Sequence, residues 1–412
     1  MRTYPKIRIK GFTDPWEQRK LGDLVERITR KNGNLESNLP LTISAQYGLI
    51  DQNEFFDKRI ASKDVSGYYL IKKGEFAYNK STSNDAEWGA IKRLDRYEKG
   101  VLSTLYIVFK IVNEEKTSSD FLVSYYETNL WHKGIQSIAA EGARNHGLLN
   151  IASKDFFETS LNVPSNFVEQ QMVGSFFKSL DILITLNQRK CESLKLVKKS
   201  FLEKLFPKDG EIFPELRFKS FTDPWEQRKL KDIANKVTTK NSGTLYVETL
   251  TNSAEFGIIS QKDFFDHNIS NLENIDGYYI VENNDFVYNP RISTSAPVGP
   301  INRNKLGRSG VMSPLYSVFR THDVDEEYVE WFFKSSKWHK FMFFNGDTGA
   351  RSDRFAIKDS VFFEMPIPIP HIDEQRKIGH FFSNLDSLIT LHQRKCDALK
   401  NAKKYFLHNM FV

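Results

Sequence analysis

The chain contains one module twice, and this duplication constrains its fold more than any other feature. The string FTDPWEQRKL stands at residues 12–21 and again at 221–230, and LITLNQRKC at 183–191 returns as LITLHQRKC at 388–396. The offset between the copies is 209 residues at the first pair and 205 at the second. Loop-length differences between two copies of one fold produce such a drift. We therefore predict a tandem duplication rather than a short-period solenoid.

Length and composition bound the class of protein. At 412 residues the chain is too long for one ordinary core, and the repeat divides it into halves of about 205 residues. The charged fraction of 27% and the hydrophobic fraction of 40% are typical of a globular protein that folds in water. No apolar run approaches the roughly 18 residues of a membrane span, and residues 1–12 lack the apolar stretch of a secretory signal. We expect a cytoplasmic protein.

Cysteine usage and charge say less about function. The two cysteines, Cys191 and Cys396, stand at equivalent repeat positions inside helical segments. Two such residues form neither a disulfide framework nor a zinc site, so we expect buried packing roles and no metal in this chain. The formal charge of +6 is compatible with an anionic partner but does not identify one.

Each half of the chain divides into a mixed domain and a long helix. Short β-rich runs such as YYLI and LYIVFK alternate with amphipathic stretches and with Gly, Asn and Ser, which predicts an α+β domain with long surface loops. Two proline-free segments with helical apolar spacing follow the domains. The predicted parts are a first domain at 1–168, a first helix at 169–206, a linker and second domain at 207–373, and a second helix at 374–412.

The two long helices are predicted to pair with each other. A helix over 169–206 is about 57 Å long, which is more than a domain of this size needs for its own packing. Because the chain runs domain, helix, domain, helix, the pair must be antiparallel, with a domain at each end. Asn187 and His392 should then lie near the crossing, and Cys191 and Cys396 too far apart for a disulfide. The apolar seam of the first helix runs through Val173, Phe176, Leu180, Leu183, Asn187, Cys191, Leu194, Val197, Phe201 and Leu205.

Sequence motifs of catalysis are missing. The chain contains no GxxxxGK[ST], HExxH or GxSxG, and no GxGxxG after a strand. YNPR at 288–291 matches the Asn-Pro-Pro-aromatic motif of amino-methyltransferases only in part, because it lacks the second proline and the aromatic residue. We expect a non-catalytic chain. A self-contained DNA methyltransferase or nuclease with an unrecognised active site is the alternative.

Recognition is expected on loops, because the frame is kept between the copies while the loops differ. Between 179–195 and 384–400, 12 of 17 residues are identical, whereas the loop after the FxYN strand reads KSTSNDAEWGAIKRL in one half and PRISTSAPVGPINRN in the other. Side chains of these types contact DNA bases and phosphates, although a solvated polar loop is the plainer interpretation for any one of them. The DNA-binding candidates are Lys80, Ser81, Thr82, Ser83, Asn84, Lys92, Arg93, Arg144, Asn145 and His146 in the first half, and Arg291, Ser293, Thr294, Ser295, Arg303, Arg351, Ser352, Asp353 and Arg354 in the second, with Ser44, Gln46, Asn252 and Glu255 as further contributors.

These motifs carry a resemblance that covers nearly the whole chain. FTDPWEQRKLGDL, the GYYLIKKGEFAYN strand pair, GVLSTLYIVF and the repeated LDxLITLxQRKCxxLK helix resemble the specificity subunit of type I DNA restriction-modification systems. The resemblance implies two target-recognition domains that each read half of a bipartite, asymmetric DNA site, with the helices setting the spacer. It also implies assembly with two adenine-methylation subunits and two restriction subunits. S-adenosylmethionine, ATP and magnesium are then expected on those partners, and no cofactor on this chain.

The repeat gives a separate reason to expect paired partners. A polar triplet largely off the apolar seam recurs in both helices: Gln188, Arg189 and Lys190 in the first, and Gln393, Arg394 and Lys395 in the second. Identical exposed faces on two equivalent helices favour one protein docking twice. Two solvated faces inherited by duplication are the plainer interpretation. A pure interaction scaffold that does not contact DNA is a further alternative for the whole chain.

Overall fold

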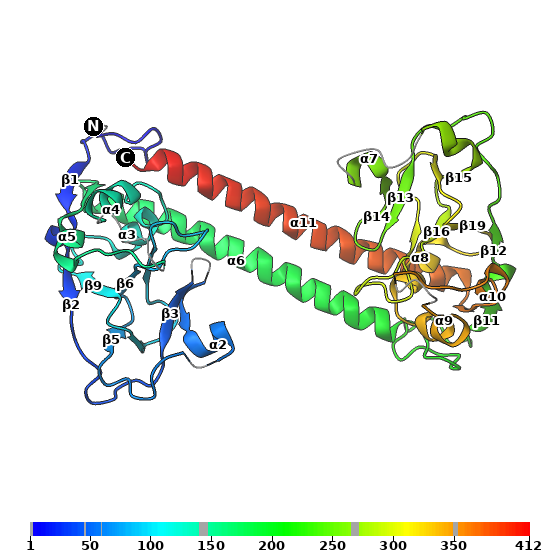
Figure 1. Ribbon diagram of the computed structural model, residues 1–412, viewed down its shortest axis with the longest axis horizontal. Helices are drawn as coiled ribbons and strands as arrows, with labels where there is room; N and C mark the ends of the chain where they lie inside the picture. The colour runs from blue at the N-terminus through cyan, green and yellow to red at the C-terminus, as the bar shows by residue number, and fades with distance from the viewer. Residues whose placement is uncertain (1–2, 45–46, 59, 140–146, 265–271, 349–352) are drawn as a thin grey trace. The chain divides into compact units, whose positions relative to one another are not determined.

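The computed structural model describes residues 3–44, 47–58, 60–139, 147–264, 272–348 and 353–412 (Figure 1). The chain splits into two compact units, a first unit of residues 1–188 with 394–412 and a second unit of residues 189–393. Each unit contains one predicted domain, the beginning of one long helix and the end of the other. This division differs from the predicted boundaries after 168, 206 and 373, because the ends of both helices pack into the cores of the domains.

The first unit has a mixed α and β core. Its elements are β1 (Glu17–Lys20), α1 (Leu21–Leu24), β2 (Val25–Ile28), β3 (Leu41–Ser44), β4 (Gly48–Asp51), α2 (Gln52–Phe56), β5 (Tyr69–Lys72), β6 (Phe76–Asn79), β7 (Ala90–Arg93), β8 (Lys99–Leu102), β9 (Ile107–Ile111), α3 (Ser119–Tyr125), α4 (His132–Ile138), α5 (Ser153–Glu158), β10 (Ser160–Val163) and the start of α6 (Phe167–Lys204). Four antiparallel strands in the order β2-β9-β6-β7 form the largest sheet, and β1-β10, β3-β4 and β5-β8 form two-stranded sheets.

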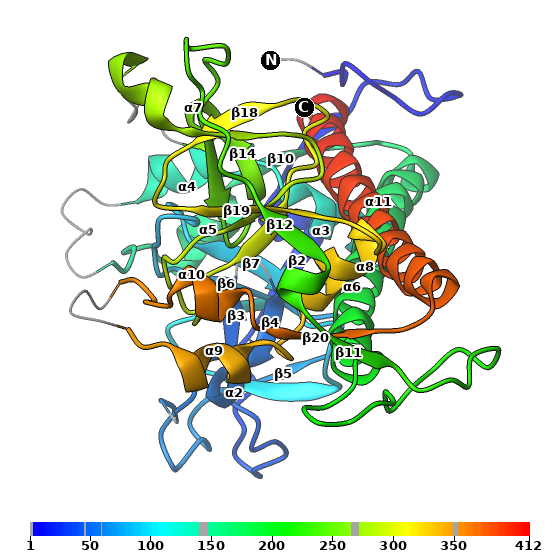
Figure 2. The ribbon, with the colours of Figure 1, turned by 90° about the vertical axis from the view of Figure 1, so that its right-hand side faces the viewer.

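The second unit repeats this topology. Its elements are β11 (Glu226–Lys229), η1 (Leu230–Asp232), β12 (Ala234–Lys236), β13 (Leu250–Ser253), β14 (Gly257–Ser260), α7 (Gln261–Phe264), η2 (Leu272–Gly277), β15 (Tyr279–Val281), β16 (Phe286–Tyr288), β17 (Ile301–Arg303), β18 (Gly310–Met312), β19 (Ser317–Thr321), α8 (Glu326–Lys334), α9 (His339–Asn345), α10 (Asp359–Phe362), β20 (Pro366–Ile369) and the start of α11 (Ile372–Met410). The sheet β12-β19-β16-β17 corresponds to β2-β9-β6-β7, and β11-β20, β13-β14 and β15-β18 to the two-stranded sheets. Helix α8 lies beside α11 in both Figure 1 and Figure 2.

The end of each long helix completes the core of one unit. Phe411, just after α11, packs edge-on against Trp16 at 6.1 Å between ring centroids and lies 5.4 Å from Phe121 in the first unit. Phe206, just after α6, lies 5.6 Å from Tyr328 in the second unit. Both phenylalanines are buried, and full burial of such a side chain stabilises the fold by about 1.5–3 kcal/mol. The helix ends are therefore parts of the domains.

The beginning of each long helix is fixed by the same polar contacts. Arg8 pairs with Glu169 of α6 at 2.7 Å, and Arg217 pairs with Glu374 of α11 at 2.8 Å. Both glutamate side chains are buried, with 1% and 0% of their surface exposed. Burying a carboxylate is unfavourable without a cation and hydrogen bonds to satisfy it. The arginine before each domain therefore ties the chain to the first turn of its helix.

Within each unit the two long helices pair antiparallel. In the first unit Phe176 of α6 meets Phe406 of α11 at 5.1 Å between centroids, and in the second Phe201 of α6 meets Phe381 of α11 at 5.0 Å. Later residues of one helix thus meet earlier residues of the other. The predicted α+β class, the tandem repeat and the antiparallel helix pair are confirmed. Both helices begin two residues before the predicted positions 169 and 374 and end two residues before 206 and 412.

The seam predicted for the first helix is partly wrong. Leu183 is 44% exposed whereas the next residue, Ile184, is 8% exposed, and the half-buried Phe176 is followed by Phe177 at 1%. Val197 is 41% exposed. A helix turns every 3.6 residues, so a strict heptad pattern drifts around its surface and the buried position moves by one residue. The predicted seam residues Val173, Cys191 and Leu205 are buried.

Two further predictions concern the middle of the helices. Cys191 and Cys396 are both free and buried, which confirms their packing role. The proximity of Asn187 to His392 relates one unit to the other and stays a prediction. Within the described part of the chain, none of the helices combines the length and apolar character that crossing a membrane requires.

Candidate nucleic-acid interface

The loops that follow β6 and β16 have the same backbone frame although their sequences differ. We call residues 80–89 and 290–299 the reading loops. In the first, Ser83 and Ala86 exchange backbone hydrogen bonds of 3.0 and 3.1 Å, and in the second Ser293 and Ala296 make the same exchange at the same lengths. Two loops with different side chains are thus held in one conformation.

Each reading loop ends on a glycine that its conformation requires. Gly89 has a φ of +78° and Gly299 a φ of +84°, a left-handed region that other residues rarely adopt. A Cβ at Gly89 would lie 2.2 Å from the carbonyl oxygen of Asn79, and a Cβ at Gly299 would lie 2.1 Å from that of Asn289. The glycine therefore lets the end of the loop approach the strand from which the loop began.

A second segment lies alongside each reading loop. The backbone N–H of Thr82 donates to the carbonyl of Gly147 at 2.7 Å, and the N–H of Ile292 donates to Asp353 at 3.0 Å. The structure thus brings the reading loops next to Gly147 and Asp353, which directly follow or belong to the later set of predicted DNA-binding residues in the sequence. Five of these predicted residues lie outside the described part of the chain: Arg144, Asn145, His146, Arg351 and Ser352.

The tips of both reading loops present polar side chains to solvent. The exposed candidates are Ser81, Ser83 and Asn84 in the first unit and Arg291, Ser293, Thr294, Ser295 and Asp353 in the second, while Thr82 and Arg354 are half-buried. The Arg291 side chain is 70% exposed and lies 3.8 Å from the Asp353 carboxylate. One frame therefore offers serine and asparagine in the first unit, and arginine, serine and threonine in the second.

Two predicted DNA-binding arginines lie inside the domains. Arg303 pairs with Glu330 of α8 at 2.8 Å, and its side chain is 8% exposed. Arg93 pairs with Asp120 of α3 at 2.8 Å, and its side chain is 12% exposed. Their position at the end of the loop favoured a DNA contact, but the carboxylates of the neighbouring helix hold both guanidinium groups. We therefore leave Arg93 and Arg303 out of the interface.

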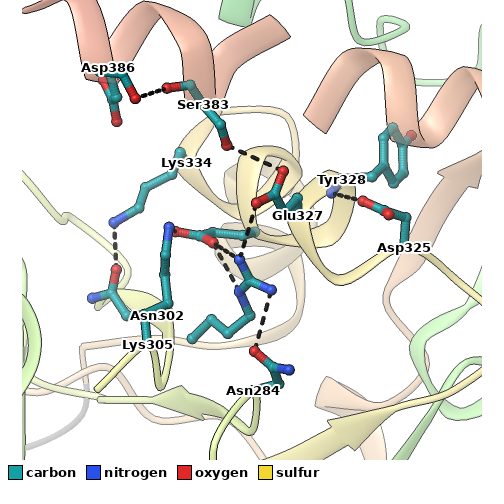
Figure 3. Close-up of polar contacts among 12 residues, drawn as sticks. Asn284, Asn302, Lys305, Asp325, Glu327, Tyr328, Lys334, Ser383 and Asp386 are labelled. Atoms are coloured by element: carbon teal, nitrogen blue, oxygen red, sulfur yellow. Dashed lines mark hydrogen bonds and ion pairs between the residues drawn. The ribbon is translucent and has the colours of Figure 1, made fainter. Parts of the chain in front are cut away.

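These arginines connect the strand after the reading loop to a long helix. Figure 3 shows the polar contacts around this network in the second unit, where Glu327 also accepts a hydrogen bond of 3.2 Å from Ser383 of α11. In the first unit Asp120 binds Lys178 of α6 at 3.0 Å. Burial by itself would raise the pKa of the Asp120 carboxyl, but hydrogen bonds from Lys178 and Arg93 outweigh it and hold the pKa below its ordinary value.

Three further candidates, Lys80, Asn252 and Ser44, are partly or fully buried. Lys80 donates a 3.5 Å hydrogen bond to the carbonyl of Ile151, and burial, followed by the charge of Arg27, lowers the pKa of its ammonium. Asn252 is 2% exposed and gives its amide hydrogens to the carbonyls of Val287 and Pro300 at 2.7 and 3.2 Å. Asn252 therefore supports β16 and its loop from within. Ser44 is buried, Glu255 is exposed, and Gln46 lies outside the described residues.

A groove of about 830 Å³ runs beside the reading loop of the first unit. It is lined by the second half of that loop with β7, by residues 126–133 around the start of α4, and by the last third of α11. Five lysines line it against three carboxylates, so it is basic: Lys92, Lys133, Lys400, Lys403 and Lys404 against Asp85, Glu87 and Glu127. Phosphate groups are the natural ligands of such a surface.

One histidine in this groove is neutral near pH 7. His132 stands edge-on to Trp131 at 4.5 Å between ring centroids. Burial lowers the pKa of its imidazole, against the smaller opposing effect of Glu87. His339 repeats the arrangement beside Trp338 at 4.7 Å, and burial again lowers its pKa. Burial thus disfavours a positive charge on His132, and the groove owes its basic character to its lysines' excess over carboxylates.

Of the five groove lysines only Lys92 was a sequence-based candidate; Lys133, Lys400, Lys403 and Lys404 were not. Their signal in the sequence is a pattern on the long helices, because Lys400, Lys403 and Lys404 repeat Lys195, Lys198 and Lys199 at an offset of 205. Spacings of three and four place these lysines on one side of a helix. The pattern alone does not show that this side turns toward the reading loop.

The middle of the long helices presents a second repeated surface. The predicted triplets are on the surface: Arg189, Lys190, Gln393, Arg394 and Lys395 are exposed and Gln188 is half-buried. Apolar side chains accompany them at equivalent positions, since Leu183 and Leu186 of the first unit are 44% and 59% exposed, and Leu388 and Leu391 of the second are each 44% exposed. Contiguous exposed apolar side chains beside polar ones are typical of protein interaction sites.

Metal chemistry has no visible site in the described ranges. No group of three or more His, Cys, Asp or Glu residues there is arranged to hold a metal ion.

Comparisons with known proteins show which proteins this chain resembles. A family model described as the type I restriction modification DNA specificity domain matches residues 222–401. The chain is 21% identical to the type I restriction enzyme MjaVIII specificity subunit of Methanocaldococcus jannaschii, over 96% of this chain and 92% of that protein. The crystal structure of the type I restriction-modification system S subunit from M. genitalium aligns with a TM-score of 0.56 and 12% identity, over 99% of each chain. The last likeness shows a shared fold.

Proposed function

We propose that the chain is a type I restriction-modification DNA specificity subunit, like the proteins that it resembles, and that it reads a bipartite, asymmetric DNA site with one half-site for each unit. The observation that carries this proposal is the pair of reading loops. Their backbones share one set of hydrogen bonds, while their exposed side chains differ. Two readers of one design that recognise different bases require this combination.

The exposed loop residues are the proposed base and phosphate contacts. Arg291 is suited to guanine, whereas Asn84 is suited to adenine, and the neighbouring serines and threonines suit several bases or phosphate. The residues Arg144, Asn145, His146, Arg351 and Ser352 remain proposed contacts because they continue the segment beside each loop. Unequal loops imply unequal half-sites, and therefore an asymmetric site.

Binding to DNA duplexes tests the proposal. Arg291→Gln and Asn84→Ala should each reduce the preference for the recognised site over mixed-sequence DNA by roughly 5–150-fold, as the loss of about 1–3 kcal/mol of base discrimination implies. The matched control is Lys63→Gln, an exposed lysine of the first unit outside the reading loops. A chain that acts only as a protein scaffold would bind no duplex, and that result would refute the proposal.

We further propose that two methylation subunits dock on the middle of the two long helices and that two restriction subunits join them. The repeated Gln-Arg-Lys triplets and their exposed leucines support this assignment, since the same surface occurs twice. Burying the leucines is favourable by about 25 cal/mol per Å² of apolar surface, and the arginines add charged hydrogen bonds. The chain would then act in the cytoplasm as the non-catalytic centre of the assembly, with S-adenosylmethionine, ATP and magnesium on its partners.

Assembly is tested by co-purification with the methylation subunits. Leu183→Ser with Leu388→Ser should lower the yield of the complex, because both copies of the surface lose apolar area. Leu105→Ser with Leu315→Ser is the matched control, since these leucines are exposed at equivalent positions of the domains. Equal yields from both double variants would remove the helix surface from the proposed interface.

A further inference from the structure

We propose that the last third of each long helix contacts DNA directly, through two lysines that hold the phosphate backbone beside each half-site. The pairs are Lys400 and Lys404 in the first unit and Lys195 and Lys199 in the second. This inference rests on the proposed function and adds a contact surface to the reading loops. Each pair stands four residues apart, which aligns the two ammonium groups along one side of the helix.

The lysine between each pair already has partners. Lys403 binds Asp181 at 2.5 Å and Glu127 at 2.7 Å in the first unit, and its side chain is 14% exposed. Lys198 binds Asp386 at 2.5 Å and stands 4.4 Å from the ring centre of Trp331 in the second. These two inner lysines hold the helices to each other and to the domains.

The outer lysines are different. Lys195, Lys199, Lys400 and Lys404 are exposed, and among the described residues the structure gives none of them an ion pair or a hydrogen bond. The packing of the fold thus neutralises one lysine of each triplet and leaves two charges facing solvent. The same division occurs in both units, where different carboxylates are involved.

The groove of the first unit places these charges next to the reading loop. Lys400 and Lys404 line it together with Lys92 and Lys133, and its lining also includes the carboxylates Asp85 and Glu87 of the loop and Glu127, which pairs with Lys403. When the base edges of a duplex face the loop, its phosphates must come close to the lysine-lined groove of the protein. This follows because a sugar-phosphate backbone runs along each side of the exposed base edges. Phosphate oxygens therefore match the lysines in charge.

The charge next to the outer lysines differs between the two units. Glu203 of the second unit occupies the position of His408 in the first, and it pairs with Lys337 at 3.7 Å and accepts a hydrogen bond from Ser336 at 3.1 Å. This carboxylate stands one turn beyond Lys199 and weakens the positive potential there. We therefore expect the first unit to contribute more phosphate affinity than the second.

The experiment measures DNA affinity against salt for the chain in complex with its methylation subunits. The variant carries Lys400→Gln and Lys404→Gln, and the charge-matched control carries Lys10→Gln and Lys219→Gln, two exposed lysines at equivalent repeat positions away from the groove and from the predicted partner surface. For a mixed-sequence duplex between about 50 and 200 mM salt, losing two phosphate contacts lowers the slope of log affinity against log salt by about 1.8. The control should keep the wild-type slope.

Every other outcome overturns either this inference or the proposed function. An unchanged slope in the groove variant overturns the inference, as does an equal fall in the control, which would reflect net charge alone. A groove variant that loses the methylation subunits but keeps its DNA affinity assigns the surface to a protein and also overturns it. If the wild-type complex binds no duplex, the proposed function itself fails. Thermal unfolding should be the same in all three proteins, because none of the substituted lysines has an ion-pair partner in the described structure.

Discussion

Asp181 of helix α6 binds Lys403 of helix α11 at 2.5 Å, and Asp386 of α11 binds Lys198 of α6 at the same distance. The second pair is the first with the two helices exchanged, because each residue has moved by one repeat of 205 positions. The duplication has therefore preserved the contacts between the helices in each unit. It has also created one difference, since Lys403 contacts a second carboxylate, Glu127, at 2.7 Å.

Because of this difference, the same substitution should lower the free energy of unfolding by different amounts in the two units. Lys403→Gln leaves Glu127, which is 22% exposed, without its cation and should destabilise the first unit by about 1–3 kcal/mol. Lys198→Gln removes the pair with Asp386, which is 46% exposed, and the contact with Trp331, and should cost about 1 kcal/mol, less than Lys403→Gln. Urea unfolding of both variants measures the two costs. Equal values would contradict this account of the inner lysines.

Arg291 in the second reading loop and Arg303 in the strand that follows it, β17, should behave in opposite ways. Arg303→Gln leaves Glu330 buried with only Lys305 at 3.2 Å, and should cost about 3 kcal/mol of unfolding free energy. Arg291→Gln should change stability by less than about 0.5 kcal/mol but lower the salt slope of DNA binding by about 1. A stable Arg303→Gln protein with a reduced salt slope would show that Arg303 contacts phosphate.

The glycine that ends the second reading loop should tolerate no side chain. Gly299→Ala combines a left-handed φ with a Cβ 2.1 Å from the Asn289 carbonyl, whereas Gly307→Ala has a similar φ of +70° and open space. The control should cost about 1–2 kcal/mol from its conformation alone, and Gly299→Ala should cost more. Denaturant unfolding compares the two variants. Specific DNA binding should fall only in Gly299→Ala, and equal loss in both would disconnect the loop frame from recognition.

Acid should weaken the contact between α3 and α6. The pKa of Asp120 is lower in the folded state than in the unfolded chain, so its ion pairs stabilise the fold fully above about pH 4 and lose their effect as pH falls through the folded pKa. Asp120→Asn should therefore be less stable than wild type at pH 7, and the difference should shrink as pH falls below about 4. Thermal unfolding across this range measures it. A difference that persists in acid would mean that shape, not charge, matters at this position.

The sequence predicted the frame better than the site. The duplication, the helix bounds to within two residues and the antiparallel pairing follow from repeat and periodicity, which are properties of the sequence itself. The role of Arg303 does not, because its partner Glu330 lies 27 residues away and meets it only when α8 packs against β17. The position of Leu183 also required the structure, since a one-residue drift of the seam separates an exposed leucine from a buried one.

The groove is a second part of the site that the sequence alone did not predict. Its lysines are visible in the sequence as a repeated pattern, but the pattern fits an outward-facing helix equally well. Only the packing of Phe411 and Phe406 against the first unit turns Lys400 and Lys404 toward the reading loop. Charge patterns therefore become sites only when tertiary contacts fix the direction of a helix.

The central claim is that each unit reads its own half-site through an interchangeable loop. Residues 81–88 and 291–298 have the same length and the same frame, so 291–298 can replace 81–88 without disturbing the flanking strands. Methylated adenines are then mapped by sequencing DNA treated with the exchanged chain and its methylation subunits. We predict that one half of the methylated sequence changes while the other half and the spacer stay the same. Changes in both halves, or in neither, would contradict the claim.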